Sequence, residues 1–160
     1  MKNRNVWCWL PAALLATLIF VLSSENGHTS YGLSMQIILS LKKFVEWVKK
    51  EPIYVSIDAI WLFTMLLRKL AHVMEYALLA IAILIPLNCY HIRRSISIMI
   101  SFGICLTYSC FDELHQIFIV DRTAKVTDVF IDCAGIMMGI ALFALAYQWR
   151  KIKNQACMLK

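Results

Sequence analysis

The sequence predicts an all-α integral membrane protein with about four transmembrane helices and one outer, interfacial amphipathic helix. Hydrophobic residues make up 61% of the 160-residue chain, and the mean hydropathy of +0.68 lies well above that of soluble proteins. Apolar runs recur at lengths close to the roughly 20 residues that a helix needs to cross a bilayer. A chain of this length forms one domain, so we predict a single membrane domain over residues 1–160.

The first apolar run covers residues 6–22 and predicts a retained first span. A cleaved signal peptide is the alternative, because the run lies at the N-terminus. Signal peptides have a shorter apolar region, followed by a small-residue cleavage site, whereas this run is longer and ends in SSENG. We therefore favour the retained helix.

Residues 33–50, LSMQIILSLKKFVEWVKK, place apolar side chains near one helical face and most of the charges opposite. This pattern is typical of a helix that lies in the membrane interface. The alternative is a solvated helix packed on the rest of the protein.

The second span is predicted to follow a helix start at Ser56 or Asp58, either of which can cap it, and to end at Pro86. Residues 61–85 form a helix roughly 37 Å long at 1.5 Å per residue, enough to cross the hydrocarbon with some tilt. The alternative is that residues 53–67 form a separate short or re-entrant element.

The third and fourth spans are predicted over residues 95–118 and 125–147, and a basic tail follows at 150–160. With four spans, both termini and the 88–95 loop share one side. That side carries eight basic residues and no acidic one: Lys2, Arg4, Arg93, Arg94, Arg150, Lys151, Lys153 and Lys160. The positive-inside rule makes it cytoplasmic, although the lysines of residues 33–50 run against the rule. Because the excess of positive charge follows the topology, no nucleic-acid partner is predicted.

The six cysteines are scattered, mostly within apolar runs, and show no CxxC motif. We interpret them as small buried hydrophobes. A disulfide between Cys110 and Cys133 stays open, since both are predicted near the outer face. No metal site and no cofactor is predicted.

Polar residues follow one face of each of the last three spans at helical spacing. Ionisable groups in a span cost about 2.5–3.5 kcal/mol each, so we expect these faces to meet and to mark a site. The candidate ligand contacts are Arg68, Lys69, His72, His115, Gln116 and the loop residue Arg122. The candidate supporting acids are Glu75, Asp112, Glu113, Asp128 and Asp132. Glu113 lies off the stripe of Asp112 and Gln116, which allows it to face water instead.

Gly135 and Gly139 form a GIMMG pattern on the same face as Asp128 and Asp132. Small residues at this spacing let two helices approach closely. We assign them to packing against the second or third span, with a homodimer contact as the alternative.

The motifs RKLAHVMEYALL, DELHQIF and DRTAKVTDVFIDCAGIMMG resemble those of the VanZ-like membrane proteins of bacteria. FVLSS at the end of the first span is similar to a serine-containing segment of that family, so the resemblance covers roughly residues 18–140. One departure is Asp121, where many members have glycine before the loop arginine. The resemblance implies a multi-pass protein of the bacterial cytoplasmic membrane with a role in the cell envelope. It further implies a link to low-level resistance to the glycopeptide teicoplanin.

Three functional hypotheses compete. We favour an outer-leaflet pocket that recognises an anionic lipid or a lipid-linked cell-wall precursor, because arginine suits bidentate phosphate contact. In this hypothesis the acids hold the cations in place. The phosphate contacts would come from Arg68, Lys69, His72 and Arg122.

The second hypothesis is an intramembrane enzyme acting on a lipid head group, in which His72 and His115 exchange protons and Arg122 stabilises phosphoryl charge. No catalytic residue is assigned, because no nucleophile is obviously paired with a histidine. The third hypothesis is a structural or interaction protein whose charges form interhelical ion pairs. Its pairs would be Arg68 with Asp128 or Asp132, and Arg122 with Asp112 or Glu113.

Overall fold

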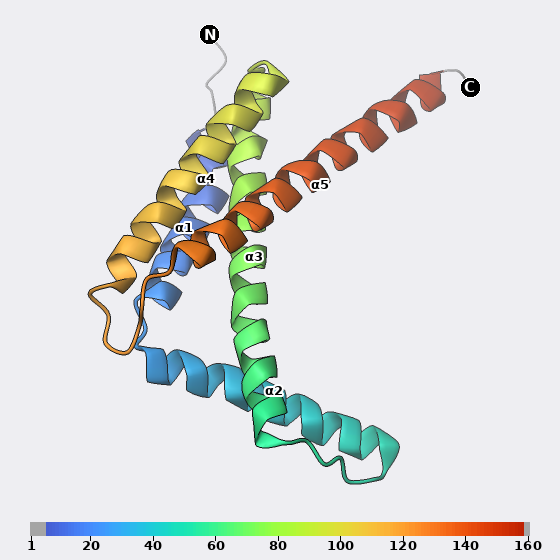
Figure 1. Ribbon diagram of the computed structural model, residues 1–160. Coiled ribbons are helices and arrows are strands. Elements are labelled where there is room, and N and C mark those ends of the chain that lie inside the picture. The colour runs from blue at the N-terminus through green and yellow to red at the C-terminus, as the bar shows by residue number, and fades with distance from the viewer. Residues whose placement is uncertain (1–5, 159–160) are drawn as a thin grey trace.

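The computed structural model describes residues 6–158, and every regular element among them is helical (Figure 1). In chain order these are the 3-10 helix η1 (Val6–Trp9), α1 (Leu10–Ser23), α2 (Gly27–Lys49), α3 (Ile57–Cys89), α4 (Arg94–Gln116) and α5 (Val126–Met158). Four segments are long and apolar enough to cross a membrane: Val6–Ser23, Ile57–Cys89, Arg94–Gln116 and Val126–Arg150. The predicted class, an all-helical membrane protein with four spans, is confirmed.

The second span is one continuous helix, α3, so the alternative of a separate element at residues 53–67 is wrong. The Ser56 side chain accepts a hydrogen bond from the backbone N–H of Ala59 at 3.2 Å, which makes Ser56 the predicted cap. The predicted end at Pro86 is also wrong, because α3 continues to Cys89. A proline in the last turn removes only one backbone donor, and the Pro86 carbonyl still accepts from the N–H of Tyr90 at 2.9 Å.

Helix α2 begins at Gly27, ahead of the expected start at residue 33. The side chain of Asn26 accepts a hydrogen bond from the N–H of Thr29 at 2.7 Å and so caps the helix. The helix ends at Lys49, and the capping residue Lys50 adopts a left-handed φ of 57°. Figure 1 shows α2 lying across the end of α3, apart from the other spans.

Helix α5 runs far beyond the expected end at residue 147, so the predicted basic tail is helical as far as Met158. No proline or glycine follows Gly139 in the sequence, and the intervening residues are mostly good helix formers. Figure 1 shows this half of α5 diverging from the bundle.

The core forms where α1, α4 and α5 pack around α3. A Cβ added to Gly135 would collide with the carbonyl oxygen of Val73, and one added to Gly139 would collide with that of Ala77. The two glycines therefore bring the backbones of α5 and α3 into direct contact. Since Asp128 and Asp132 lie on the same face of α5, this contact turns them toward α3.

The interpretation of the cysteines as buried is wrong for most of the described ones. Of these five free cysteines, Cys105 is buried, whereas Cys89 and Cys110 are exposed. Apolar side chains of a spanning helix face lipid as readily as the core, so hydropathy does not distinguish the two. No disulfide joins Cys110 to Cys133, and the side chain of Cys157 lies outside the described residues.

Candidate functional site

The loop between α4 and α5 is bound to the corner between α1 and α2. Arg122 donates hydrogen bonds from Nε to the carbonyl oxygen of Glu25 at 2.9 Å and from a terminal nitrogen to that of Leu22 at 3.1 Å. The N–H of Gly27 donates to the carbonyl oxygen of Val120 at 3.1 Å. The last carbonyls of a helix lack intrahelical donors and carry partial negative charge, so the guanidinium of Arg122 satisfies and neutralises the end of α1.

The turn that presents Arg122 has Asp121 in the left-handed region, with φ of 58°. This conformation favours glycine but is tolerated by aspartate. Asp121, the departure from the VanZ-like pattern, thus has a backbone conformation that glycine adopts readily. The carboxylate of Asp121 lies 3.5 Å from Nε2 of His28 at the surface.

Gly27→Ala is expected to lower the free energy of unfolding by about 1–3 kcal/mol, the usual cost of overpacking. An added Cβ at Gly27 would collide with the backbone carbonyl of Asp121, so the loop that holds Arg122 would have to move. Chemical unfolding in detergent measures the change. Gly32→Ala in the same helix is the control, because an added Cβ meets no atom within 4 Å there. Equal effects of the two substitutions would contradict the close contact.

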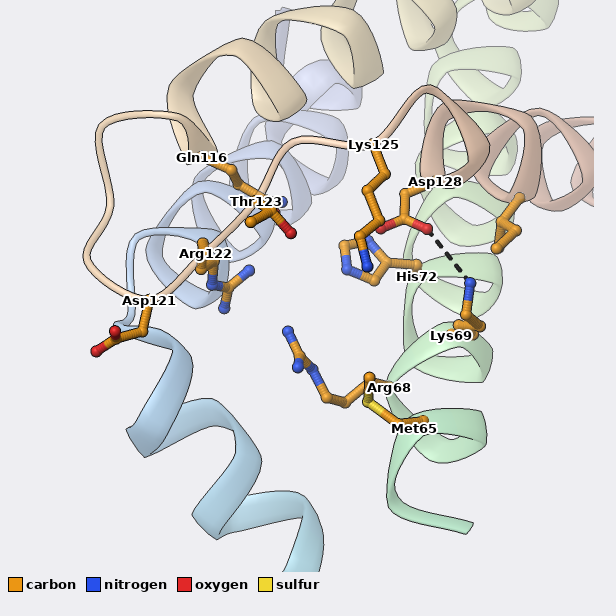
Figure 2. A pocket seen from close by; sticks show the side chains of 11 residues that line it. Met65, Arg68, Lys69, His72, Gln116, Asp121, Arg122, Thr123, Lys125 and Asp128 are labelled. Atoms are coloured by element: carbon orange, nitrogen blue, oxygen red, sulfur yellow. Dashed lines mark hydrogen bonds and ion pairs between the residues drawn. The ribbon is translucent and has the colours of Figure 1, made fainter. Parts of the chain in front are cut away.

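A cavity of about 230 Å³ opens between α3, the α4–α5 loop and the start of α5 (Figure 2). Its lining includes four cationic and two acidic side chains beside His72: Arg68, Lys69, Arg122, Lys125, Asp121 and Asp128. Figure 2 shows the guanidinium groups of Arg68 and Arg122 pointing into the same space from opposite sides.

The four cations differ in what holds them. Lys69 forms an ion pair with Asp128 at 3.3 Å, and Arg122 is bound to backbone carbonyls. The side chains of Arg68 and Lys125 make no hydrogen bond or ion pair with any residue that the structure describes. The cavity thus contains an arginine whose donors are free for a ligand.

Behind the cavity, a buried acid faces His72. Asp132 has no exposed surface, and one of its oxygens accepts a hydrogen bond from the Ser109 hydroxyl at 2.6 Å. Its other oxygen lies 3.6 Å from Nδ1 of His72. Glu75 is 4.0 Å from the same nitrogen. The imidazole therefore has carboxylates on one edge and lines the cavity with another part of the ring.

Two further acids are tied to neighbouring helices. The side-chain nitrogen of Gln116 donates to Asp112 at 3.2 Å and to the Ser23 hydroxyl at 3.1 Å, which links α4 to α1. Glu113 is buried and accepts a hydrogen bond from the N–H of Lys125 at 2.8 Å. The interpretation of Glu113 as water-facing is wrong, because a carboxylate at the start of α5 compensates an N–H that has no intrahelical acceptor.

His115 lies away from the cavity, against α1. Its ring stacks on Phe20 with the ring centroids 4.8 Å apart, and its Nε2 lies 3.2 Å from the Ser24 hydroxyl. The other candidate ligand contacts line the cavity.

Several buried polar atoms in this region have no hydrogen-bond partner within the described structure. They are Nδ1 of His72, the hydroxyl of Tyr76 and one carboxylate oxygen each of Asp112, Glu113 and Asp132. Buried polar groups are normally satisfied, so a cluster of five marks a place for water or a polar ligand. Tyr76 and Ser109 were not among the candidates. Tyr76 follows His72 by four residues and Ser109 precedes Asp112 by three, and this helical spacing is the signal that could have identified them.

The ion pairs expected for a purely structural network are not formed. Neither Arg68 nor Arg122 lies within ion-pair distance of a carboxylate in the described part of the chain. Among the same residues, no three His, Cys, Asp or Glu side chains are placed to hold a metal ion together.

A comparison with protein families matches residues 8–147 to the model described as VanZ/LLP1. The match covers most of the chain and includes α1, α2, α3, α4 and the motif-bearing part of α5. Searches of curated proteins and of solved structures found no match.

Proposed function

This chain belongs to the VanZ/LLP1 family, and on that premise we propose that it recognises the phosphate of an anionic lipid or lipid-linked cell-wall precursor from the outer leaflet. The observation that carries the proposal is Arg68, which points into the cavity with its donors unused. An arginine kept free at a membrane-embedded cavity is costly unless a ligand or water satisfies it.

The electrostatics of the cavity favour an anion. Burial lowers the pKa of Arg122 from its ordinary value, and the nearby positive charge of Arg68 acts in the same direction, with Asp112 and Glu113 opposing both. Two guanidinium groups that repel each other across a cavity are the arrangement that a phosphate stabilises. Each offers planar, charge-assisted donors to separate oxygens.

A ligand in the cell envelope agrees with the family's link to glycopeptide resistance. Lipid-linked cell-wall intermediates carry phosphate next to a long hydrocarbon chain, and they are exposed at the outer leaflet. A membrane protein that binds them or neighbouring anionic lipids would change the surface that a glycopeptide such as teicoplanin meets.

The test is ligand retention by the purified protein. Protein in detergent is incubated with equimolar phosphatidylglycerol, undecaprenyl phosphate and phosphatidylcholine, and the retained lipids are identified by native mass spectrometry. We expect retention of at least one of the first two lipids and little retention of the zwitterionic phosphatidylcholine. Equal retention of all three would contradict phosphate recognition by the cationic cavity.

The pairing of His72 with Asp132 supports a second candidate function, an intramembrane enzyme acting on a lipid head group. A carboxylate oxygen of Asp132 lies 3.6 Å from Nδ1 and so favours one orientation of the imidazole, which leaves the other ring nitrogen to exchange a proton with a bound head group. The same incubation distinguishes the two candidates, because turnover changes the mass of the head group. Repeating it with a chelator shows whether a divalent metal takes part.

We further propose that the cavity opens on the outer side of a cytoplasmic membrane. In Figure 1 the start of α1, the α3–α4 turn and the far end of α5 lie toward one end of the bundle, and α2 and the α4–α5 loop lie toward the other. Among the described residues, the first end carries Arg93, Arg94, Arg150, Lys151 and Lys153 and no acidic residue, which is the asymmetry to which the positive-inside rule applies; Lys2, Arg4 and Lys160 lie outside the described residues.

Fusion reporters after residue 160 and within residues 121–125 are expected to give opposite results. A C-terminal fusion should yield fluorescent green fluorescent protein and inactive alkaline phosphatase. Alkaline phosphatase inserted in the α4–α5 loop should be active, because the loop is placed outside. An active C-terminal phosphatase would reverse the orientation and place the cavity on the cytoplasmic side.

A further inference from the structure

A second cavity of about 250 Å³ lies beside the first, between the end of α1, the first half of α2 and α3. Arg68, His72 and Arg122 line both cavities, so the two meet at these residues. Most of the lining surface of the second cavity is apolar, although Glu25 and Glu75 also line it. The apolar side chains are those of Leu22, Leu33, Ile37, Leu67 and Ala71.

Small side chains create this space. Ser30 and Ser34 are one turn apart on α2, and Ala71 lies on the facing surface of α3. The hydroxyl of Ser34 donates to the carbonyl oxygen of Ser30 at 3.0 Å, within its own helix. Since that hydroxyl is already satisfied, this part of the wall presents mostly carbon to an occupant.

The second cavity continues into an open groove along α2. The groove shares Leu33 and Ile37 with the cavity and extends over Leu41 and Phe44. These four residues follow one helical face, and the first three are each about half exposed. An apolar path therefore leads from the cationic cavity along α2 as far as Phe44, in the second half of that helix.

We propose that the ligand is a lipid whose phosphate lies between Arg68 and Arg122 and whose hydrocarbon chain runs through the second cavity and along α2. This inference rests on the proposed function and adds a chain-binding site to it. The juxtaposition of a cationic cavity and an apolar one, joined at three shared residues, matches the two ends of such a lipid. A free phosphate or a soluble phosphorylated sugar would leave the apolar cavity unused.

The chain contact predicts that affinity depends on chain length. Each methylene buried in the second cavity strengthens binding by roughly fourfold. The affinity of the protein in detergent is measured for two soluble lipids with one head group, dihexanoyl- and dioctanoyl-phosphatidylglycerol. We expect the longer lipid to bind at least tenfold more tightly to the wild type.

Ser34→Phe fills the second cavity. It is expected to remove the gain in affinity of the dioctanoyl over the dihexanoyl lipid, while the affinity for the dihexanoyl lipid stays within about threefold of the wild-type value. Gly32→Phe in the same helix is the matched control, because a Cβ there meets open space and residue 32 does not line the cavity. It should keep the gain. Ala71→Leu, which narrows the cavity from α3, is the second test if Ser34→Phe does not fold.

The outcomes separate this inference from the proposed function. If the wild type binds both lipids equally, or if the filled variants keep the gain, the chain-binding site is wrong. In that case a loss of both lipids in Arg68→Ala still supports phosphate recognition. If Arg68→Ala binds both lipids as tightly as the wild type does, the proposed function itself is overturned.

Discussion

Gly139→Val and Gly135→Val are each expected to destabilise the bundle by about 3 kcal/mol, near the upper end of the range for overpacking. The added side chain would meet the carbonyl oxygen of Ala77 or Val73, which is rigid helix backbone and not the flexible end of a side chain. The two helices would have to separate along their contact. Because α3 forms the centre of the fold, we expect the double variant to fail to accumulate in the membrane.

Gly103→Val provides the control for this prediction. Gly103 lies in the middle of α4, where an added Cβ meets no atom within 4 Å, so the substitution should change stability by less than about 0.5 kcal/mol. The measurements are the amount of protein in isolated membranes and the unfolding midpoint in detergent. If all three substitutions reduce both values equally, the loss reflects valine in a spanning helix and not the contact of α5 with α3.

The sequence predicted the number of spans and the convergence of their polar faces, because both depend on patterns within single helices. Hydropathy marked the four spans, and helical spacing placed Asp128 and Asp132 on the face that carries Gly135 and Gly139. The structure brings that face against α3. The errors at the helix ends concern Pro86, which α3 tolerates in its last turn, and the segment after residue 147, which contains no helix breaker.

The partner of each charge could not be predicted from the sequence. A pattern shows that Arg122 and an acid lie at similar depths, but not that Arg122 instead binds the carbonyls of Leu22 and Glu25. Those carbonyls are available only because α1 ends beside the α4–α5 loop, which is a tertiary arrangement. Likewise, the helical angle of Glu113 left open whether it supports the site or faces water, whereas the backbone N–H of Lys125, beside the start of α5, donates to it. The N–H and C=O groups at helix ends carry partial charges, and a prediction that pairs only charged side chains leaves them out.

Arg68→Ala is expected to weaken lipid binding by roughly 10- to 150-fold, the effect of losing a charged hydrogen-bond donor worth about 1.5–3 kcal/mol. Its effect on unfolding should stay below about 0.5 kcal/mol, because Arg68 donates to no described residue and its removal leaves no buried acceptor unsatisfied. Arg68→Lys keeps the charge but loses the planar fork, so we expect an intermediate loss of affinity.

Arg122→Ala is the informative comparison, because the same residue type at the same cavity has a different role. Its removal leaves the carbonyls of Leu22 and Glu25 without their donor, so stability should fall by about 1–3 kcal/mol along with binding. Isothermal titration calorimetry with the lipid and chemical unfolding, each applied to both variants, separate the loss of binding from the loss of stability. If Arg68→Ala destabilises the protein as much as Arg122→Ala does, Arg68 has a structural partner and is not held free for a ligand. A large loss of binding at unchanged stability is the combination that a ligand-binding arginine produces and a structural one does not.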